Sequence, residues 1–204
     1  MSATIDDLRP DPRDPGLVRV KVAGTVFGPI RRDDAERLGL EPGRRWTKMI
    51  ERAVRALVAE MGCRADALRR LGRRDMTQAM LAERLAPKWG EATAASVAAT
   101  LAADGWIDDG AYASRRAQTL QLRAPMAPEA LRDRLESEGV RGAAADRAAR
   151  EAHDPKALRA AVRAWAAKGR DAAWIARALG RQGFDADTIA AALHRAGLPC
   201  TPDE

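Results

Sequence analysis

The sequence has few aromatic side chains, only two cysteines and no long apolar run. Phe, Trp and Tyr together make up 4% of its 204 residues. Cys63 and Cys200 lie far apart and outside any Cys-x-x-Cys or Cys/His spacing, so we expect reduced, structural cysteines rather than a disulfide or a metal site. No stretch reaches the ~18 apolar residues of a membrane span, and the N-terminus lacks the apolar core of a signal peptide. These absences predict a soluble cytoplasmic protein with no membrane association.

Recognisable catalytic motifs are also absent. The sequence contains no GxxxxGKS/T, GxSxG or HExxH pattern. His153 and His194 stand alone, without a Cys, Asp or Glu spacing that suggests a metal. Asp108 and Asp109 are adjacent carboxylates, but at a helix start such a pair serves as a cap and as a partner of the helix dipole. We therefore expect no catalytic residue, no metal and no cofactor.

Positive charge is the main compositional bias, with a formal net charge of +6. Residues 1–75 carry 17 basic and 12 acidic side chains, residues 76–124 carry 5 and 5, and residues 125–204 carry 13 and 12. By this count nearly all of the surplus lies in the first 75 residues. Most of the basic residues are Arg, whose planar guanidinium suits bidentate contacts to phosphate or carboxylate, although a GC-rich genome would produce the same bias. The surplus indicates an anionic partner.

Two short regions precede the helical part of the chain. Residues 1–16 are rich in Asp, Pro and Arg, with almost nothing to bury, which predicts a disordered leader. Residues 17–30 alternate valines with Leu, Arg and Lys around an Ala-Gly turn, the pattern of a small β-hairpin. Asp33 and Asp34 are expected to cap a short helix that runs through Leu38. Because one hairpin is not stable alone, we assign it with its helices to a segment of residues 17–62.

An internal repeat organises the rest of the chain. Three segments align, residues 76–85 (MTQAMLAERL), 126–135 (MAPEALRDRL) and 170–179 (RDAAWIARAL). Their apolar positions coincide, and each begins with helix-start chemistry: Thr77 and Asp171 are good N-caps, and Pro128 suits the first helical position. Each leads into a second helix through a turn. In the second repeat Arg141 takes the cap position, so that helix should fray, and in the first repeat the linker over residues 86–93 is longer.

A third helix precedes each pair, starting near Ala65, Asp108 and Asp154. The sequence thus predicts an all-α fold, a tandem and elongated array of three three-helix repeats after the small N-terminal β-hairpin. The expected boundaries are a leader 1–16, the hairpin segment 17–62, repeats 64–103, 104–152 and 153–198, and a tail 199–204. The tryptophans at positions 89, 106, 165 and 174 are expected to pack between helices.

Three strings make the chain similar to a known family, the RecX regulatory proteins. They are residues 67–75 (ALRRLGRRD), 105–113 (GWIDDGAYA) and 182–189 (QGFDADTI), and the resemblance extends over about residues 17–198. The second string, with its order and spacing relative to the others, is the most specific. The family pattern, a small β-containing segment followed by three repeats of three helices, matches the organisation above.

The resemblance implies regulation rather than catalysis. Members of the family bind RecA recombinase, preferably as the nucleoprotein filament, and inhibit its ATP hydrolysis and strand exchange. We therefore expect a monomeric modulator of DNA recombination, DNA repair and the SOS response, with a weak single- or double-stranded DNA contact at most. The candidate partner-binding residues are Arg69, Arg70, Arg73, Arg74, Arg115, Arg116, Arg123, Arg132 and Arg134.

Each of these assignments has an alternative. The arginines at positions 69–74 fall opposite Leu68 and Leu71 on a helical wheel, but such a face also serves simply to keep a protein soluble. The later arginines lie among acidic residues and are more typical of surface ion pairs. A helical DNA-binding transcriptional regulator is the alternative function, because each repeat contains helices joined by a short turn. That class needs a recognition helix rich in base-reading side chains, and stretches such as TIAAALHR have few of them.

Overall fold

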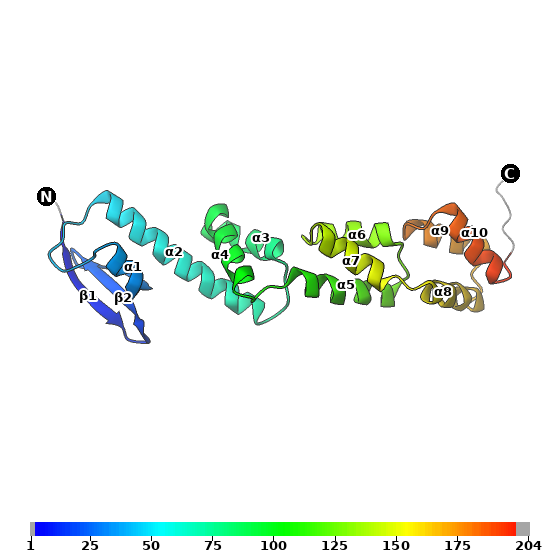
Figure 1. Cartoon of the computed structure of the whole chain (residues 1–204), viewed down its shortest axis with the longest axis horizontal. Helices are drawn as coiled ribbons and strands as arrows, with labels where there is room; N and C mark the ends of the chain where they lie inside the picture. The colour runs from blue at the N-terminus through cyan, green and yellow to red at the C-terminus, as the bar shows by residue number, and fades with distance from the viewer. Residues whose placement is uncertain (1–2, 199–204) are drawn as a thin grey trace. The chain divides into compact units, whose positions relative to one another are not determined.

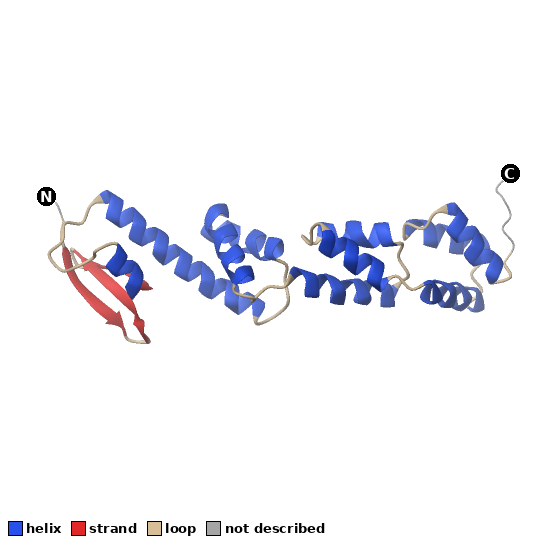
Figure 2. Ribbon diagram, in the orientation of Figure 1, coloured by secondary structure: helices blue, strands red, loops and turns tan. Residues whose placement is uncertain are grey.

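The computed structural model describes residues 3–198, so Cys200 and the predicted tail 199–204 lie outside the described residues. Ten helices and one three-stranded antiparallel sheet are described, which confirms the mainly helical fold class (Figures 1 and 2). The chain divides into two compact units. The first holds residues up to 74 together with 81–104, and the second holds residues 75–80 and those from 105 onward.

The sheet of the first unit has the strand order β1-β2-β3. Strand β1 spans Ile5–Asp11, β2 spans Asp14–Val22 and β3 spans Thr25–Arg31. The predicted hairpin is confirmed as β2 and β3, which pair up to Val22 and Thr25 across the Ala-Gly turn. Both turn residues have positive φ, 46° and 79°, as a two-residue hairpin turn of the primed kind requires.

The prediction of a disordered leader over residues 1–16 is wrong from residue 5 onward, because β1 lies there. The composition of these residues indicated disorder because the strand is held by backbone pairing with β2 and buries few side chains. Ile5 is its one buried apolar side chain. Asp11 is also buried, but its carboxylate accepts hydrogen bonds from Arg19 Nε at 2.7 Å and from the Arg13 backbone N–H at 2.9 Å. Pro10 is tolerated because β1 is an edge strand.

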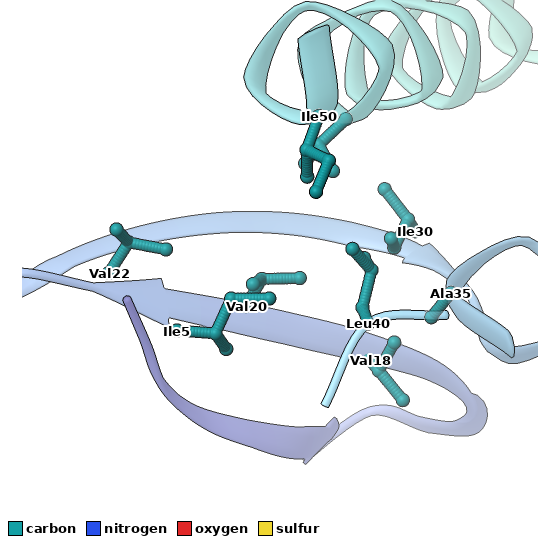
Figure 3. Packing of buried hydrophobic residues seen from close by; sticks show 9 residues of the cluster. Ile5, Val18, Val20, Val22, Ile30, Ala35, Leu40 and Ile50 are labelled. Carbon is teal, nitrogen blue, oxygen red and sulfur yellow. The ribbon is translucent and has the colours of Figure 1, made fainter. Parts of the chain in front are cut away.

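The core of the first unit lies between the sheet and two helices. Helix α1 spans Arg32–Arg37 and α2 spans Lys48–Leu71. Figure 3 shows the buried side chains of this core, which come from the sheet, the two helices and the loop between them: Ile5, Val18, Val20, Val22, Ile30, Ala35, Leu40 and Ile50. Asp33 and Asp34 lie in the first turn of α1 rather than capping it; the cap position is Arg31, without a side-chain hydrogen bond.

Helix α2 is much longer than the short helix expected from Ala65, because it runs unbroken from the Thr47 cap to Leu71. Helices α3 (Gln78–Trp89) and α4 (Glu91–Ala103) follow it. The predicted linker over residues 86–93 is also wrong: α3 continues through Pro87, and only Gly90 separates the two helices. The helical course of α3 places the Trp89 ring against Gly62 of α2, where any β-carbon would overlap the ring.

The second unit contains two consecutive groups of three helices. The first group is α5 (Asp109–Arg123), α6 (Pro128–Ser137) and α7 (Ala143–Ala152). The second is α8 (Pro155–Ala167), α9 (Ala172–Arg181) and α10 (Ala186–Arg195). The aligned apolar positions of the three repeated segments are all fully buried: Leu81, Leu85, Leu131, Leu135, Ile175 and Leu179.

Within the helical repeats, capping follows the predicted chemistry with one exception. Asp108, Asp171 and Asp185 each accept a backbone N–H three residues further on. Arg141 is not the cap of α7; Gly142 takes that position, with φ 60° and no side-chain hydrogen bond. The helix therefore starts without a polar cap, as expected, but one residue later than the pattern indicated.

A contact between consecutive repeated helices occurs twice in the structure, and we call it the joint: a donor just before one helix bonds to the carbonyl just after the next. Thr77 Oγ1, at the start of α3, donates to the Glu138 carbonyl at 2.9 Å, just after α6. One repeat later, the backbone N–H of Ala127, before α6, donates to the Gln182 carbonyl at 2.9 Å, just after α9. The start of each such helix is thus tied to the end of its counterpart in the next repeat.

A glycine makes each joint this close. Gly139 and Gly183 have φ of 87° and 84°, a left-handed conformation that terminates α6 and α9. A β-carbon on Gly139 would lie 2.7 Å from the Ala79 Cβ, and one on Gly183 would lie 2.6 Å from the Ala130 Cβ. Both approaches are closer than carbon atoms tolerate, so backbone conformation and spacing each require glycine here.

We predict that Gly139→Ala and Gly183→Ala each lower the free energy of unfolding by about 2 kcal/mol or more. A left-handed conformation costs a β-carbon about 1–2 kcal/mol, and overpacking adds about 1–3 kcal/mol. Gly169→Ala is the matched control, because Gly169 has φ 76° and no atom within 4 Å of a β-carbon. Urea unfolding measures all three variants; an equal loss in the control would contradict the close-approach argument.

Candidate partner-binding surfaces

The nine candidate arginines fall into the two compact units. Those at positions 69, 70, 73 and 74 belong to the end of α2 and the turn after it, in the first unit. Those at positions 115, 116, 123, 132 and 134 belong to α5 and α6, in the second unit. The structure separates them further, because some are engaged by carboxylates of the chain itself and others are not.

Asp66 gathers three cations and one indole at the end of α2. Its carboxylate accepts hydrogen bonds from Arg69 Nη2 at 2.9 Å and from Trp89 Nε1 at 3.2 Å. Lys88 Nζ lies 3.6 Å away and Arg70 Nε 3.7 Å away. Asp66 is buried, so these contacts replace the water that its charge would otherwise bind. Trp89 and Lys88 therefore connect α3 to α2 through Asp66, while Arg69 and Arg70 contact the same carboxylate from within α2.

These contacts set the acidity of Asp66. The hydrogen bond from Arg69, then that from Trp89, lower its pKa to about 2, against the opposing effect of burial. The group therefore stays ionised over the whole physiological range. Trp89 is accordingly packed on α2, as expected from the sequence, and its indole N–H has a definite partner.

Arg73 and Arg74 differ from their neighbours on α2. Both are exposed, and neither forms an ion pair within residues 3–198. They lie in the turn after Gly72, where their backbone N–H groups bond to the Arg70 carbonyl. Of the four arginines placed on one helix face by the sequence, the structure brings only Arg69 and Arg70 onto α2, and it leaves Arg73 and Arg74 available to a partner.

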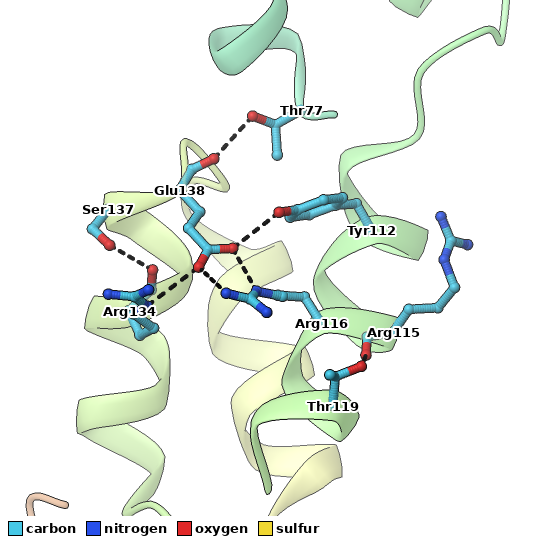
Figure 4. Close-up of polar contacts among 8 residues, drawn as sticks. All are labelled: Thr77, Tyr112, Arg115, Arg116, Thr119, Arg134, Ser137 and Glu138. Carbon is cyan, nitrogen blue, oxygen red and sulfur yellow. Dashed lines mark hydrogen bonds and ion pairs between the residues drawn. The ribbon is translucent and has the colours of Figure 1, made fainter. Parts of the chain in front are cut away.

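Glu138 forms a second cluster, shown in Figure 4. Arg116 contacts it with both Nε and Nη2, at 2.8 and 2.7 Å, the bidentate geometry that favours guanidinium–carboxylate pairs. Tyr112 donates its hydroxyl at 2.9 Å, and Arg134 Nε lies 3.2 Å away. The pair with Arg116 is the main reason that the pKa of Glu138 is lowered. Since the Glu138 carbonyl also accepts from Thr77, this cluster supports the joint described above.

The remaining candidates of the second unit are more exposed. Arg115 pairs with Asp75 at 2.7 Å, and Arg132 pairs with the neighbouring Asp133 at 2.7 Å. Such exposed pairs contribute little to stability. Arg123, in the last turn of α5, is exposed and forms no ion pair with any described residue. Arg73, Arg74 and Arg123 are thus the candidates that form no ion pair among residues 3–198.

Large exposed apolar side chains form a feature that the sequence pattern did not reveal. Trp106 is 59% exposed, so the expectation that it packs between helices is wrong. It lies in the turn before α5, where its neighbour Ile107 is buried instead. Leu122, in the last turn of α5, is 89% exposed. By contrast Trp165 and Trp174 pack edge-to-face with ring centroids 5.7 Å apart, as expected.

A basic group on α8–α10 was also missed. Residues 153–198 hold eight Lys and Arg side chains and four carboxylates, whereas residues 104–152 hold eight and nine. A single count over residues 125–204 combines these two repeats and conceals the difference. Counting by repeat would have found this surplus from the sequence.

Two further properties concern the described residues alone. No helix among them is both long and apolar enough to cross a membrane. Nor do they bring together three or more His, Cys, Asp or Glu side chains in a way that could hold a metal ion. Cys63 is a free thiol, and its pKa is raised chiefly because it is buried on α2.

Comparison with known proteins identifies the fold. No family model and no curated protein matches the sequence. Among solved structures, a crystal structure of regulatory protein RecX superposes with a TM-score of 0.65 at 16% identity, covering 96% of this chain and 92% of the other. RecX from Lactobacillus salivarius superposes with a TM-score of 0.54 at 18% identity, covering 68% of this chain and 97% of the other. The chain therefore has the fold of the RecX structures, as its resemblance predicted.

We predict that Asp66 stabilises the protein in a pH-dependent way. Its pKa is lower in the folded than in the unfolded state, so the unfolded state binds more protons as the pH falls. Its contribution of about 2 kcal/mol is therefore present above about pH 4 and is lost as the pH falls to about 2.

Urea unfolding of the wild type and of Asp66→Asn at several pH values measures this. The variant should be less stable by about 2 kcal/mol at neutral pH, and the difference should shrink between pH 4 and 2. Glu60→Gln, an exposed change on the same helix, serves as the control. A difference that does not vary with pH would contradict the role of the Asp66 charge.

Proposed function

We propose that this chain is a member of the RecX family that binds RecA and its nucleoprotein filament. In doing so it inhibits RecA ATP hydrolysis and strand exchange, and thereby modulates recombination, DNA repair and the SOS response. It acts as a cytoplasmic monomer without a catalytic reaction of its own. Contact with RecA, preferably in the filamentous form, is its main interaction, and direct contact with DNA is weaker.

The observation that carries this proposal is the extent of the fold match. A superposition over 96% of the chain includes the N-terminal sheet as well as the helical groups. The three short strings on which the resemblance rests agree with it independently, and two of them coincide with defined structural features. Residues 105–113 form the Asp108-capped start of α5, and residues 182–189 form the joint glycine and the Asp185 cap of α10.

The surface supports a partner with negative charge. Arg73, Arg74 and Arg123 are exposed and are not engaged by carboxylates of the described chain. Guanidinium groups that are exposed and form no internal ion pair can bind carboxylates or phosphates of a partner without first breaking such a pair. Trp106, exposed beside the α5 start, adds an aromatic side chain of the type that anchors protein interfaces.

We predict that the purified protein suppresses the DNA-dependent ATPase activity of its cognate RecA at substoichiometric to stoichiometric ratios. Binding along a filament affects many subunits, so full inhibition should not require a large excess. Steady-state ATP hydrolysis with saturating single-stranded DNA measures this, and binding to free and filamentous RecA is compared with binding to bare DNA. Unchanged RecA turnover together with tight binding to one defined duplex sequence would contradict the proposal and favour a transcriptional regulator.

We further predict that Arg73→Glu combined with Arg74→Glu weakens binding to RecA filaments by roughly tenfold, a change of about 1.4 kcal/mol. The fold should be unaffected, because both side chains are exposed and neither forms an ion pair with a residue of the described part of the chain. Reversing Arg69 or Arg70 would be a poorer test, since a new carboxylate would face buried Asp66.

The matched control for this pair is Arg141→Glu combined with Arg150→Glu, which makes the same charge change at exposed positions of the second unit. The defect of the first pair should shrink with added salt, because exposed charges are screened over about 8–10 Å. Equal losses from both pairs would mean that only the total charge matters.

A further inference from the structure

The last helical group, α8–α10, has a charge distribution unlike the rest of the second unit. Its eight basic side chains face only four carboxylates within residues 153–198. None of the eight takes part in an ion pair with any residue that the structure describes. In α5–α7, by contrast, Arg116 and Arg134 share Glu138.

The basic side chains of this group form no ion pairs because its carboxylates bond to backbone groups or lie at helix starts. Asp154, Asp171 and Asp185 cap α8, α9 and α10 and accept backbone N–H groups at 2.8, 2.7 and 2.6 Å. Asp187 lies in the first turn of α10. All four thus sit at helix starts, where they stabilise the helices. The fold of this repeat uses its acids at helix starts and leaves its cations without ion pairs among the described residues; Arg170 instead lies over the Trp174 ring, 4.7 Å from its centroid.

Three of these cations converge on one spot. Arg159 and Arg163 lie one turn apart on α8, and with Arg195 in the last turn of α10 they line a small hollow together with Ala192 and Ala196. The hollow measures about 10 Å³, which admits one oxygen atom rather than a side chain. Lys156 is on the same face of α8, since it precedes Arg159 by three residues.

We propose that this surface, defined by Arg159, Arg163 and Arg195, binds the phosphodiester backbone of nucleic acid without regard to sequence. It gives the weaker DNA contact of the proposed function a surface of its own, so it rests in part on that function but can be tested without RecA. Three guanidiniums from two helices around a small hollow suit a phosphate group, whose oxygens each accept charge-assisted hydrogen bonds.

Two observations favour nucleic acid over an acidic protein segment. Protein interfaces commonly combine arginine with aromatic anchors, and none of the large exposed hydrophobic side chains of residues 3–198 lies in α8–α10. The single amide side chain in residues 153–198 is Gln182, which is half-buried at the end of α9. Specific reading of adenine uses Asn or Gln, so the surface should contact the backbone rather than the bases.

The test compares the wild type with the triple variant Arg159→Gln, Arg163→Gln and Arg195→Gln, using two short fluorescent duplexes of unrelated sequence and the full-length chain. The wild type should bind both duplexes equally. The variant should bind both duplexes about tenfold or more weakly near 0.1 M salt. The slope of log K against log salt concentration should be smaller in magnitude by about 2–3, because each lost phosphate contact removes about 0.9 from it. Replacing the same three arginines with Lys should retain most of the binding, since the charge remains.

The matched control is Arg141→Gln, Arg147→Gln and Arg150→Gln, which removes the same charge from exposed positions on the neighbouring repeat. Circular dichroism establishes that each variant is folded. The proposal is overturned if the two Gln triples lose affinity equally, or if the first triple binds the duplexes as the wild type does. Binding to polyglutamate is measured as well, as a model of an acidic protein segment. If the first triple variant loses binding to polyglutamate but binds DNA as the wild type does, the proposal is overturned in favour of an acidic protein partner. Neither result would bear on inhibition of the RecA ATPase.

Discussion

The repeated joint between successive helices is the constraint on which the second unit depends. Its alanine-rich helices bury small side chains, such as Ala145, Ala148 and Ala149 of α7, and small side chains contribute little apolar area each. Stability must then come from close backbone approach. Gly139 and Gly183 permit that approach, and the carbonyls just before them accept hydrogen bonds from the start of the preceding repeated helix. A fold with so few aromatic residues can be ordered because its backbones come close together.

The polar cluster at Glu138 follows from the same constraint. The carbonyl of Glu138 belongs to the joint, so the position of its side chain is set by the end of α6. A half-buried carboxylate at that place needs cationic and hydroxyl partners, and Arg116, Arg134 and Tyr112 provide them. The second joint has the neutral Gln182 at the equivalent position, and no such cluster forms around it among the described residues. The arginines of the Glu138 cluster are absent there as well, since Ala178 stands at the position equivalent to Arg134.

The helical repeats were predictable because their signals are local. Apolar periodicity, the caps Asp108, Asp171 and Asp185, and the turn glycines all act within a few residues of the helix they define. The errors concern features that depend on distant partners. Strand β1 exists because β2 pairs with it, although its own composition resembles a disordered segment. Helix α2 continues through Gly62, and the Trp89 ring that packs against this glycine comes from α3, many residues away in sequence. The pairing of Arg69 with Asp66 is different, because it is a local contact three residues apart on α2 that helical spacing could have indicated, whereas Arg73 has no acid at such a spacing.

The distribution of acids among the repeats explains how similar helical groups can differ in surface chemistry. In α8–α10 every carboxylate lies at a helix start, and the cations are left without ion pairs among the described residues. Helix α7 instead begins at Gly142 with no polar cap, and residues 104–152 hold nine acids against eight cations, with Asp104, Asp133 and Glu138 in ion pairs. Capping and ion pairing compete for the same side chains, because one carboxylate at a helix start is poorly placed to neutralise an arginine further along. A repeat that gains a capping aspartate in place of a mid-helix acid therefore becomes both better defined as a helix and more positive on its faces. In this way, changes that serve the stability of a helical array also determine which of its repeats can meet an anionic partner.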